Sequence, residues 1–213
     1  MEILGVIGGV IALLIIIYIY LPDIMDYKEL EYLDNYENSL LEELKNISRS
    51  FGMMDENLLS SEDIDYKWEE FASDYMVEAV KSINKFPEFT IGCAAYVGFA
   101  VAKWWDSDWG KGHNAKYESL LGERGFDDMD DFIMQKILGY DLKSTEASIL
   151  SNIALVLAQA SMDRIRKEHI ETQSVKAFYI LSRTLKVMFK IGASIQLKRM
   201  GYKYQKVNFA NKS

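Results

Sequence analysis

The hydrophobic pattern opens with a run of nineteen uncharged residues, ILGVIGGVIALLIIIYIYL, at positions 3–21. A helix of this length spans the hydrocarbon core of a bilayer, because it rises roughly 1.5 Å per residue. Tyr18 and Tyr20 are placed as interfacial aromatic residues, and Pro22 ends the run. A cleaved signal peptide would have a basic start and a small-residue cleavage site, and a buried soluble segment would have a polar face. The pattern therefore favours a single-pass transmembrane anchor over residues 1–22, in contact with membrane lipid through residues 3–21.

The flanks of this run bear on its orientation and on self-association. Only two residues precede it, and Lys28 is the one cation that follows closely. This favours a body on the cytoplasmic side, since positive charge near a span stays inside. Gly5 and Gly9 form a G-x-x-x-G pair, which would permit a homodimer through the anchor.

Beyond the anchor, apolar residues recur at three- and four-residue steps, with no run of alternating strand pattern. We therefore expect an all-α protein: an N-terminal transmembrane helix followed by an irregular bundle of about five to seven helices. The expected parts are an amphipathic helix at 23–52, a bundle domain at 53–200 and a basic flexible tail at 201–213. Long helices are expected at 26–51, 62–85, 88–105, 145–169 and 173–199, and short ones near 115–121 and 129–138.

One of these helices, 88–105, has almost no polar face and is expected at the centre of the bundle. Ala94, Gly98 and Ala102 lie four residues apart on one side, a spacing that lets a neighbouring backbone approach closely. Helical phasing places Trp105 on this same side. We therefore expect Trp105 in the core, and Trp104 and Trp109 in freer positions.

Charge is divided unevenly along the chain, whose net charge is −8. Residues 164–213 carry +10 and residues 1–163 carry −18. Either the basic C-terminal helix packs beside acidic helices of its own domain, or it contacts anionic lipid or an acidic partner. The candidate basic surface consists of Lys176, Arg183, Lys186 and Lys190. Nucleic acid is not an expected partner, because the isoelectric point is about 4.9 and no helix-turn-helix or zinc pattern is present.

The segment AVAKWWDSDWGKG, residues 100–112, contains three of the four tryptophans. Asp106 and Asp108 have the spacing that begins a calcium loop, but the later loop positions lack the required oxygen ligands. His113 is the one histidine nearby, so no metal site is predicted. The aspartates of FDDMDDF, residues 126–132, suit the first turn of a helix. No catalytic motif is present, and neither a catalytic residue nor a cofactor is predicted.

Trp104, Asp106, Asp108 and Trp109 remain as a candidate binding surface, since indole rings anchor contacts that a neighbouring acid can orient. The competing interpretation is a packing corner in which indoles cover the core and an aspartate caps a turn. We expect a membrane-anchored helical interaction protein with a protein partner: an adaptor, an immunity or inhibitor type, or a subunit of a membrane complex. The alternatives are an enzyme with an acidic pocket around Asp106, Asp108 and His113, or a soluble structural protein.

Overall fold

The computed structural model describes residues 27–204, with the exception of the side chain of Trp109. The predicted anchor with its Gly5 and Gly9 pair and the tail from residue 205 lie outside the described residues. Residues 27–204 form seven α-helices and no strand, which confirms the all-α bundle. Within this range, no helix combines the length and the apolar character that crossing a membrane requires.

The helix boundaries follow the predicted segments closely for the long helices. Ser144 and Ser174 precede two of them, and each hydroxyl accepts a hydrogen bond from the backbone three residues later, as N-caps do. Pro87 occupies the first turn of another, where its missing N–H costs nothing. The α-helices are α2 (Tyr27–Ser50), α3 (Glu62–Ser82), α4 (Pro87–Ser107), α5 (Trp109–Asn114), α6 (Met129–Phe132), α7 (Thr145–Lys167) and α8 (Val175–Arg199).

The segment between α5 and α7 is built from short turns of several kinds. Two 3₁₀ turns, Tyr117–Leu120 and Phe126–Asp128, precede α6, and a π-helical turn, Ile133–Ile137, follows it directly. The two short helices predicted near 115–121 and 129–138 were thus right in place, and the second begins as the α-helix α6. The 3₁₀ and π-helical turns on either side of α6 bond at three- and five-residue intervals, which the 3.6-residue period does not describe.

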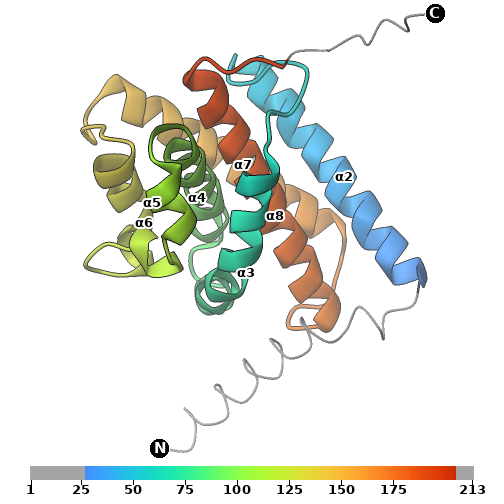
Figure 1. Cartoon of the computed structure of the whole chain (residues 1–213). Coiled ribbons are helices and arrows are strands. Elements are labelled where there is room, and N and C mark those ends of the chain that lie inside the picture. The colour runs from blue at the N-terminus through green and yellow to red at the C-terminus, as the bar shows by residue number, and fades with distance from the viewer. Residues whose placement is uncertain (1–26, 205–213) are drawn as a thin grey trace, which may run out of the picture.

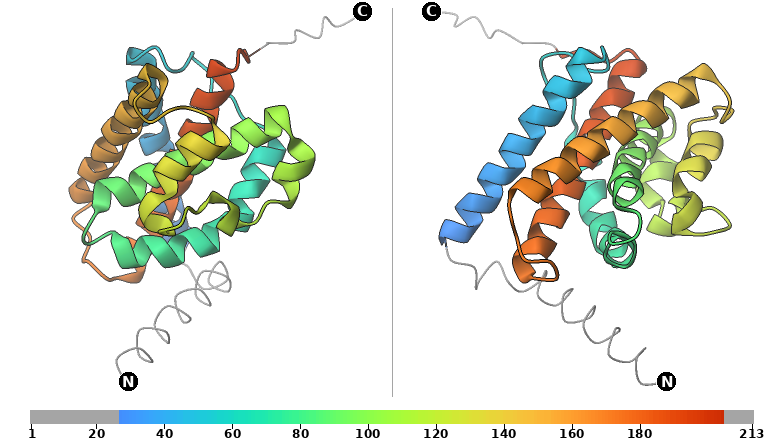
Figure 2. Two further views of the ribbon diagram at one scale, coloured as in Figure 1. Left: turned by 90° about the vertical axis from the view of Figure 1, so that its left-hand side faces the viewer. Right: turned by 180° about the vertical axis from the view of Figure 1, so that it is seen from behind.

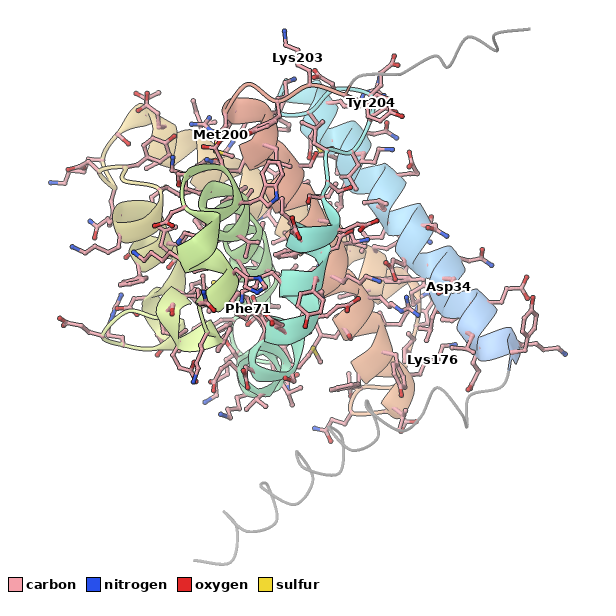
Figure 3. All side chains as sticks on the ribbon, in the orientation of Figure 1. Asp34, Phe71, Lys176, Met200, Lys203 and Tyr204 are labelled. Carbon is pink, nitrogen blue, oxygen red and sulfur yellow. The ribbon has the colours of Figure 1, made fainter. Side chains whose placement is uncertain are left out.

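In space, α2 lies along one side of the molecule, and α5 and α6 lie on the opposite side (Figure 1). The helices α4, α7 and α8 run between them, as the views from the side and from behind also show (Figure 2). The helix α8 spans the bundle, since Lys176 near its start and Lys203 just beyond its end lie at opposite ends of the molecule (Figure 3). The candidate corner therefore lies on the side of the bundle away from α2.

The helices α4 and α8 make the most extensive contact in the fold. They cross at two glycines: a Cβ added to Gly98 would lie 2.2 Å from the carbonyl oxygen of Phe189, and one added to Gly192 would lie 2.2 Å from that of Ala95. The backbones can approach this closely only because neither glycine carries a side chain. The small-residue side of α4 that the sequence indicated thus holds α8.

The helix α8 is a second central helix rather than a surface helix. Nearly all of its residues from Ile180 to Leu197 are buried or half-buried. The cations in its middle, Arg183, Lys186 and Lys190, do not face open solvent, because acidic residues of α2 and α3 lie against them. This arrangement agrees with the first interpretation of the basic C-terminal third, in which α8 packs beside acidic helices of its own domain.

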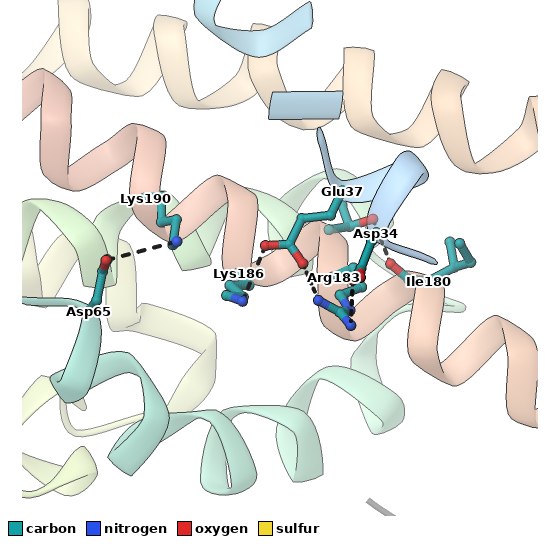
Figure 4. A network of polar contacts seen from close by, with 8 residues as sticks. Asp34, Glu37, Asp65, Ile180, Arg183, Lys186 and Lys190 are labelled. Atoms are coloured by element: carbon teal, nitrogen blue, oxygen red, sulfur yellow. Dashed lines mark hydrogen bonds and ion pairs between the residues drawn. The ribbon is translucent and has the colours of Figure 1, made fainter. Parts of the chain in front are cut away.

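Ion pairs join α8 to α2 and α3 (Figure 4). The Arg183 guanidinium contacts both Asp34 and Glu37, and Lys186 Nζ lies 3.2 Å from Glu37. Further along, Lys190 Nζ lies 3.8 Å from Asp65. Three of the four residues of the candidate basic surface are thus neutralised inside the domain. The fourth, Lys176, is exposed, and its Nζ lies 3.9 Å from the centre of the Tyr32 ring.

Glu37 is the centre of this network, and its side chain is only 14% exposed. Burial by itself raises the pKa of its carboxyl, but Lys186 and Arg183 outweigh burial, and the pKa lies below its ordinary value of 4.5. A carboxyl whose pKa is lowered on folding stabilises the fold above its unfolded pKa. That contribution is lost as the pH falls through the folded pKa.

Replacing this carboxylate should therefore have a pH-dependent effect. At pH 7 the Glu37→Gln variant should be less stable than the wild type by about 2 kcal/mol, because charged hydrogen bonds are lost. The difference should narrow as the pH falls below 4.5, where the wild-type carboxyl also becomes neutral. Urea unfolding of both proteins at several pH values measures it. A difference that stays constant with pH would show that the charge of Glu37 contributes nothing.

Candidate binding corner and pocket

One of the two tryptophans at the end of α4 differs from the expectation. Trp104 is buried, with 9% of its surface exposed, on the side that α5 and the π-helical turn cover. The expectation that Trp104 is in a freer position was therefore wrong. Trp105 is half-buried and packs against the core, as its phasing indicated.

Trp105 and Asp106 are joined to the residues that follow α8. The rings of Trp105 and Tyr202 meet edge to face with centroids 5.4 Å apart, and the Tyr202 hydroxyl donates a 2.9 Å hydrogen bond to Asp106. On the other side, Trp105 Nε1 donates to Asp63 at 3.4 Å. Tyr202 is thus held against the corner, although the tail was expected to be flexible from residue 201.

Asp108 has a structural role at this corner. Its carboxylate accepts a 3.1 Å hydrogen bond from the backbone N–H of Lys111 and so caps α5. This agrees with the packing interpretation for that one residue. Asp106 is exposed and makes no such cap. The structure describes the backbone of Trp109 as the first residue of α5.

A buried lysine fixes α5 to α3. The Lys67 side chain is 2% exposed, and its Nζ donates to Glu70 at 2.5 Å and to the backbone carbonyl of His113 at 2.8 Å. A cation suits that carbonyl because the C-terminal end of a helix is its negative end. Sequence reasoning missed this residue, although Lys67 falls on the same helical face as Ile64 and Phe71.

An open pocket of about 600 Å³ lies beside the corner. Its size falls within the range of small-molecule and anchor-residue sites in proteins, about 300–1,000 Å³. Trp104 contributes from α4 and Lys111 and Asn114 from α5, while Phe132 of α6 and the π-helical turn form the facing wall. The lining residues are Trp104, Gly110, Lys111, Asn114, Ala115, Ser119, Phe132, Lys136 and Ile137. None of the described residues that line the pocket is acidic.

The π-helical turn gives the pocket one of its walls. The N–H of Leu138 donates to the carbonyl of Ile133 at 2.9 Å, five residues back. Bonding at this interval places Phe132, Lys136 and Ile137 on one side of the turn, where all three line the pocket. Single π-helical turns inside helices are rare and occur frequently at functional sites.

The aspartates of the segment 126–132 do not line this pocket. The Asp128 carboxylate accepts a 3.2 Å hydrogen bond from the backbone N–H of Arg124 and forms an ion pair with the Arg124 guanidinium at 3.5 Å. Its side chain does not cap α6. Asp130 is half-buried, and burial raises the pKa of its carboxyl, although the hydrogen bond from the backbone N–H of Asp131 acts in the opposite direction. Among the described residues, no three potential metal ligands come together. Cys93 is buried, and burial raises the pKa of its thiol far above the ordinary value.

Comparisons with known proteins give no relative from which a function could be taken: no family model, no curated protein and no solved structure matches this chain. The site therefore has to be interpreted from its own residues.

Three residues of this site had no place in the sequence-based prediction: Tyr202, Lys136 and Phe132. Tyr202 reaches the corner from almost 100 positions further along the chain, and no local pattern signals such a contact. Lys136 and Phe132 looked like ordinary parts of a short amphipathic helix. The rarity of a π-helical turn, rather than any residue type, is what makes this segment stand out.

Proposed function

We propose that this protein is a membrane-anchored binding module, whose helical domain engages a protein partner through the exposed end of α4 and the pocket beside it. The observation that carries the proposal is the arrangement of Trp105, Asp106 and Tyr202 next to an open pocket walled by Trp104. Tryptophan and tyrosine are among the residues on which protein interfaces most often depend, and a charged group beside them helps to orient a contact.

The uncharged run at 3–21 supports the membrane location. It has the length of a membrane span, contains Tyr18 and Tyr20 near its end and is followed by Pro22. A domain held at a membrane meets partners there at a raised effective concentration, so an interface of modest area suffices. Orientation toward the cytoplasm, an adaptor or inhibitor role, and a homodimer through Gly5 and Gly9 belong to the same proposal.

The ion pairs of α8 bear on where the partner would bind. Arg183, Lys186 and Lys190 are occupied within the domain and are poor candidates for an external contact. Asp106, by contrast, is exposed, and its one hydrogen bond, to Tyr202, is itself exposed. A partner could replace that bond at low cost, because exposed hydrogen bonds contribute little to stability.

The test is co-purification of the full chain from detergent-solubilised native membranes. Asp106→Ala should reduce recovery of the partner at least about tenfold, the effect of losing one charged hydrogen bond at an interface. The melting temperature should stay near that of the wild type, since Asp106 is exposed. Glu171→Ala, which removes an exposed acid in the loop between α7 and α8, is the matched control and should retain the partner. Equal recovery with both variants would contradict a role for the corner.

A further inference from the structure

The chemistry of the pocket walls indicates what part of a partner would enter it. Its floor is apolar and aromatic, formed by Trp104, Phe132 and Ile137, and two lysines, Lys111 and Lys136, stand among the lining residues. Such a lining suits a ligand with an apolar body and a charged end. It suits a phosphate group less well, since phosphate sites use many donors and little apolar surface.

The charge balance around these lysines gives the sign of the ligand. The chain as a whole is acidic, with a net charge of −8, and it neutralises the cations of α8 with carboxylates of α2 and α3. Lys111 and Lys136 differ from those cations. Both are exposed, and within residues 27–204 neither is joined to an acid by an ion pair. Two unpaired cations in a pocket whose described lining has no acid attract an anion.

The polar groups of the lining agree with a ligand carrying one small charged group. The Asn114 amide donates one hydrogen bond to the Gly110 carbonyl at 2.8 Å, within α5, and the other uncharged polar side chain of the lining is Ser119. The charged donors that the pocket offers to a ligand are the two ammonium groups, and a carboxylate has two oxygens to accept from them. The apolar floor would bury the carbon skeleton next to that carboxylate.

We propose that this pocket binds an apolar, preferably aromatic, group that carries a carboxylate, and that the partner of the proposed function supplies this group as its anchor. The inference rests on the proposed function for the source of the group, but the chemistry rests on the pocket alone. Trp104 stacks against the apolar part, and Lys111 and Lys136 bind the carboxylate.

The test uses phenylacetate as the probe and phenylacetamide, its neutral analogue of nearly the same shape, as the control ligand. The full chain is labelled with 5-fluorotryptophan and placed in lipid nanodiscs, and the ¹⁹F resonance of Trp104 is identified with the Trp104→Phe variant. Phenylacetate should shift this resonance in a saturable manner. Phenylacetamide should bind at least about tenfold more weakly, because the charged hydrogen bonds are absent.

Two variants distinguish a loss of the binding lysines from a loss of the fold. In the double variant Lys111→Gln and Lys136→Gln, phenylacetate should bind as weakly as the amide, while the other fluorotryptophan resonances stay unchanged. Lys143→Gln, at an exposed lysine outside the pocket lining, should bind phenylacetate as the wild type does. Absence of a saturable shift, or equal affinity for acid and amide, would overturn the proposal.

The outcome distinguishes this inference from the proposed function. If phenylacetate fails to bind while Asp106→Ala still loses its partner, the inference is wrong and the binding corner stands. If phenylacetate binds as expected but Asp106→Ala keeps every partner, the proposed function is wrong. In that case the source of the carboxylate is a free small molecule, which overturns the part of the inference that assigns it to a protein.

Discussion

Gly98→Ala should destabilise the fold by at least about 3 kcal/mol, although it adds only one methyl group to the middle of a helix. The new Cβ would lie 2.2 Å from the carbonyl oxygen of Phe189 and 2.6 Å from the backbone nitrogen of Ala193. Both atoms belong to the backbone of α8, so no side chain can turn away to make room. Only separation of α4 from α8 relieves the overlap, and the core between them would then loosen.

Gly92→Ala in the same helix is the matched control. Gly92 is also buried, but a Cβ there would meet only Ala154 and Ala158, both at 3.9 Å, which is ordinary contact. Because alanine favours the helix, we expect this variant to be neutral or stabilised by up to about 1 kcal/mol. Urea unfolding of the full chain in detergent, followed by near-ultraviolet circular dichroism, compares the two variants. Similar stability changes for Gly92→Ala and Gly98→Ala would contradict the close crossing of α4 and α8.

Tyr75→Ala should remove about 4 kcal/mol, the upper part of the range for truncating a buried aromatic residue. Tyr75 is fully buried in α3, and its ring meets those of Trp68, Tyr117 and Phe126 at centroid distances of 5.7, 6.3 and 5.5 Å. Tyr117 and Phe126 belong to the irregular segment that precedes the pocket wall. The cavity left by this truncation would therefore loosen that segment as well as the core.

The Tyr75→Phe variant separates the contribution of the ring to stability from that of the hydroxyl. The hydroxyl donates a 2.6 Å hydrogen bond to the carbonyl of Thr90, which is itself buried. Its loss leaves that oxygen with fewer partners and should cost about 1–2 kcal/mol, less than half the effect of Tyr75→Ala. The same urea titrations measure both variants. If Tyr75→Phe costs as much as Tyr75→Ala, the hydrogen bond rather than ring packing stabilises this part of the core.

Local patterns were sufficient to predict the long helices. The apolar stripe of α3, the proline at the start of α4 and the cap at Ser144 each depend on a few neighbouring residues. The close approach at Gly98 could also be anticipated, because the small residues lie four apart on one helix. All of these features follow from the 3.6-residue period or from capping chemistry. The cap at Ser174 was not predicted, because that helix was expected to begin at residue 173.

What the sequence alone left open depends on contacts between distant segments. The sequence left open whether the cations of α8 pack beside acidic helices of the same domain or contact lipid or a partner. Only the structure shows that Asp34, Glu37 and Asp65 lie against Arg183, Lys186 and Lys190. The burial of Trp104 depends on where α5 and the π-helical turn lie. No helical period describes that segment, and its position cannot be read from the end of α4.

The most direct test of the central claim, a membrane-anchored domain that binds a partner at the end of α4, is site-specific photo-crosslinking in intact cells. A photoreactive amino acid replaces Ser107, the exposed neighbour of Asp106, in the full chain, so that the Asp106 carboxylate is kept. The membranes are washed with alkaline carbonate after irradiation. The account predicts a discrete crosslinked adduct that stays in the carbonate-resistant membrane fraction. The same amino acid at Glu171 should give no such adduct. Equal crosslinking from both positions, or release of the protein by carbonate, would contradict the account.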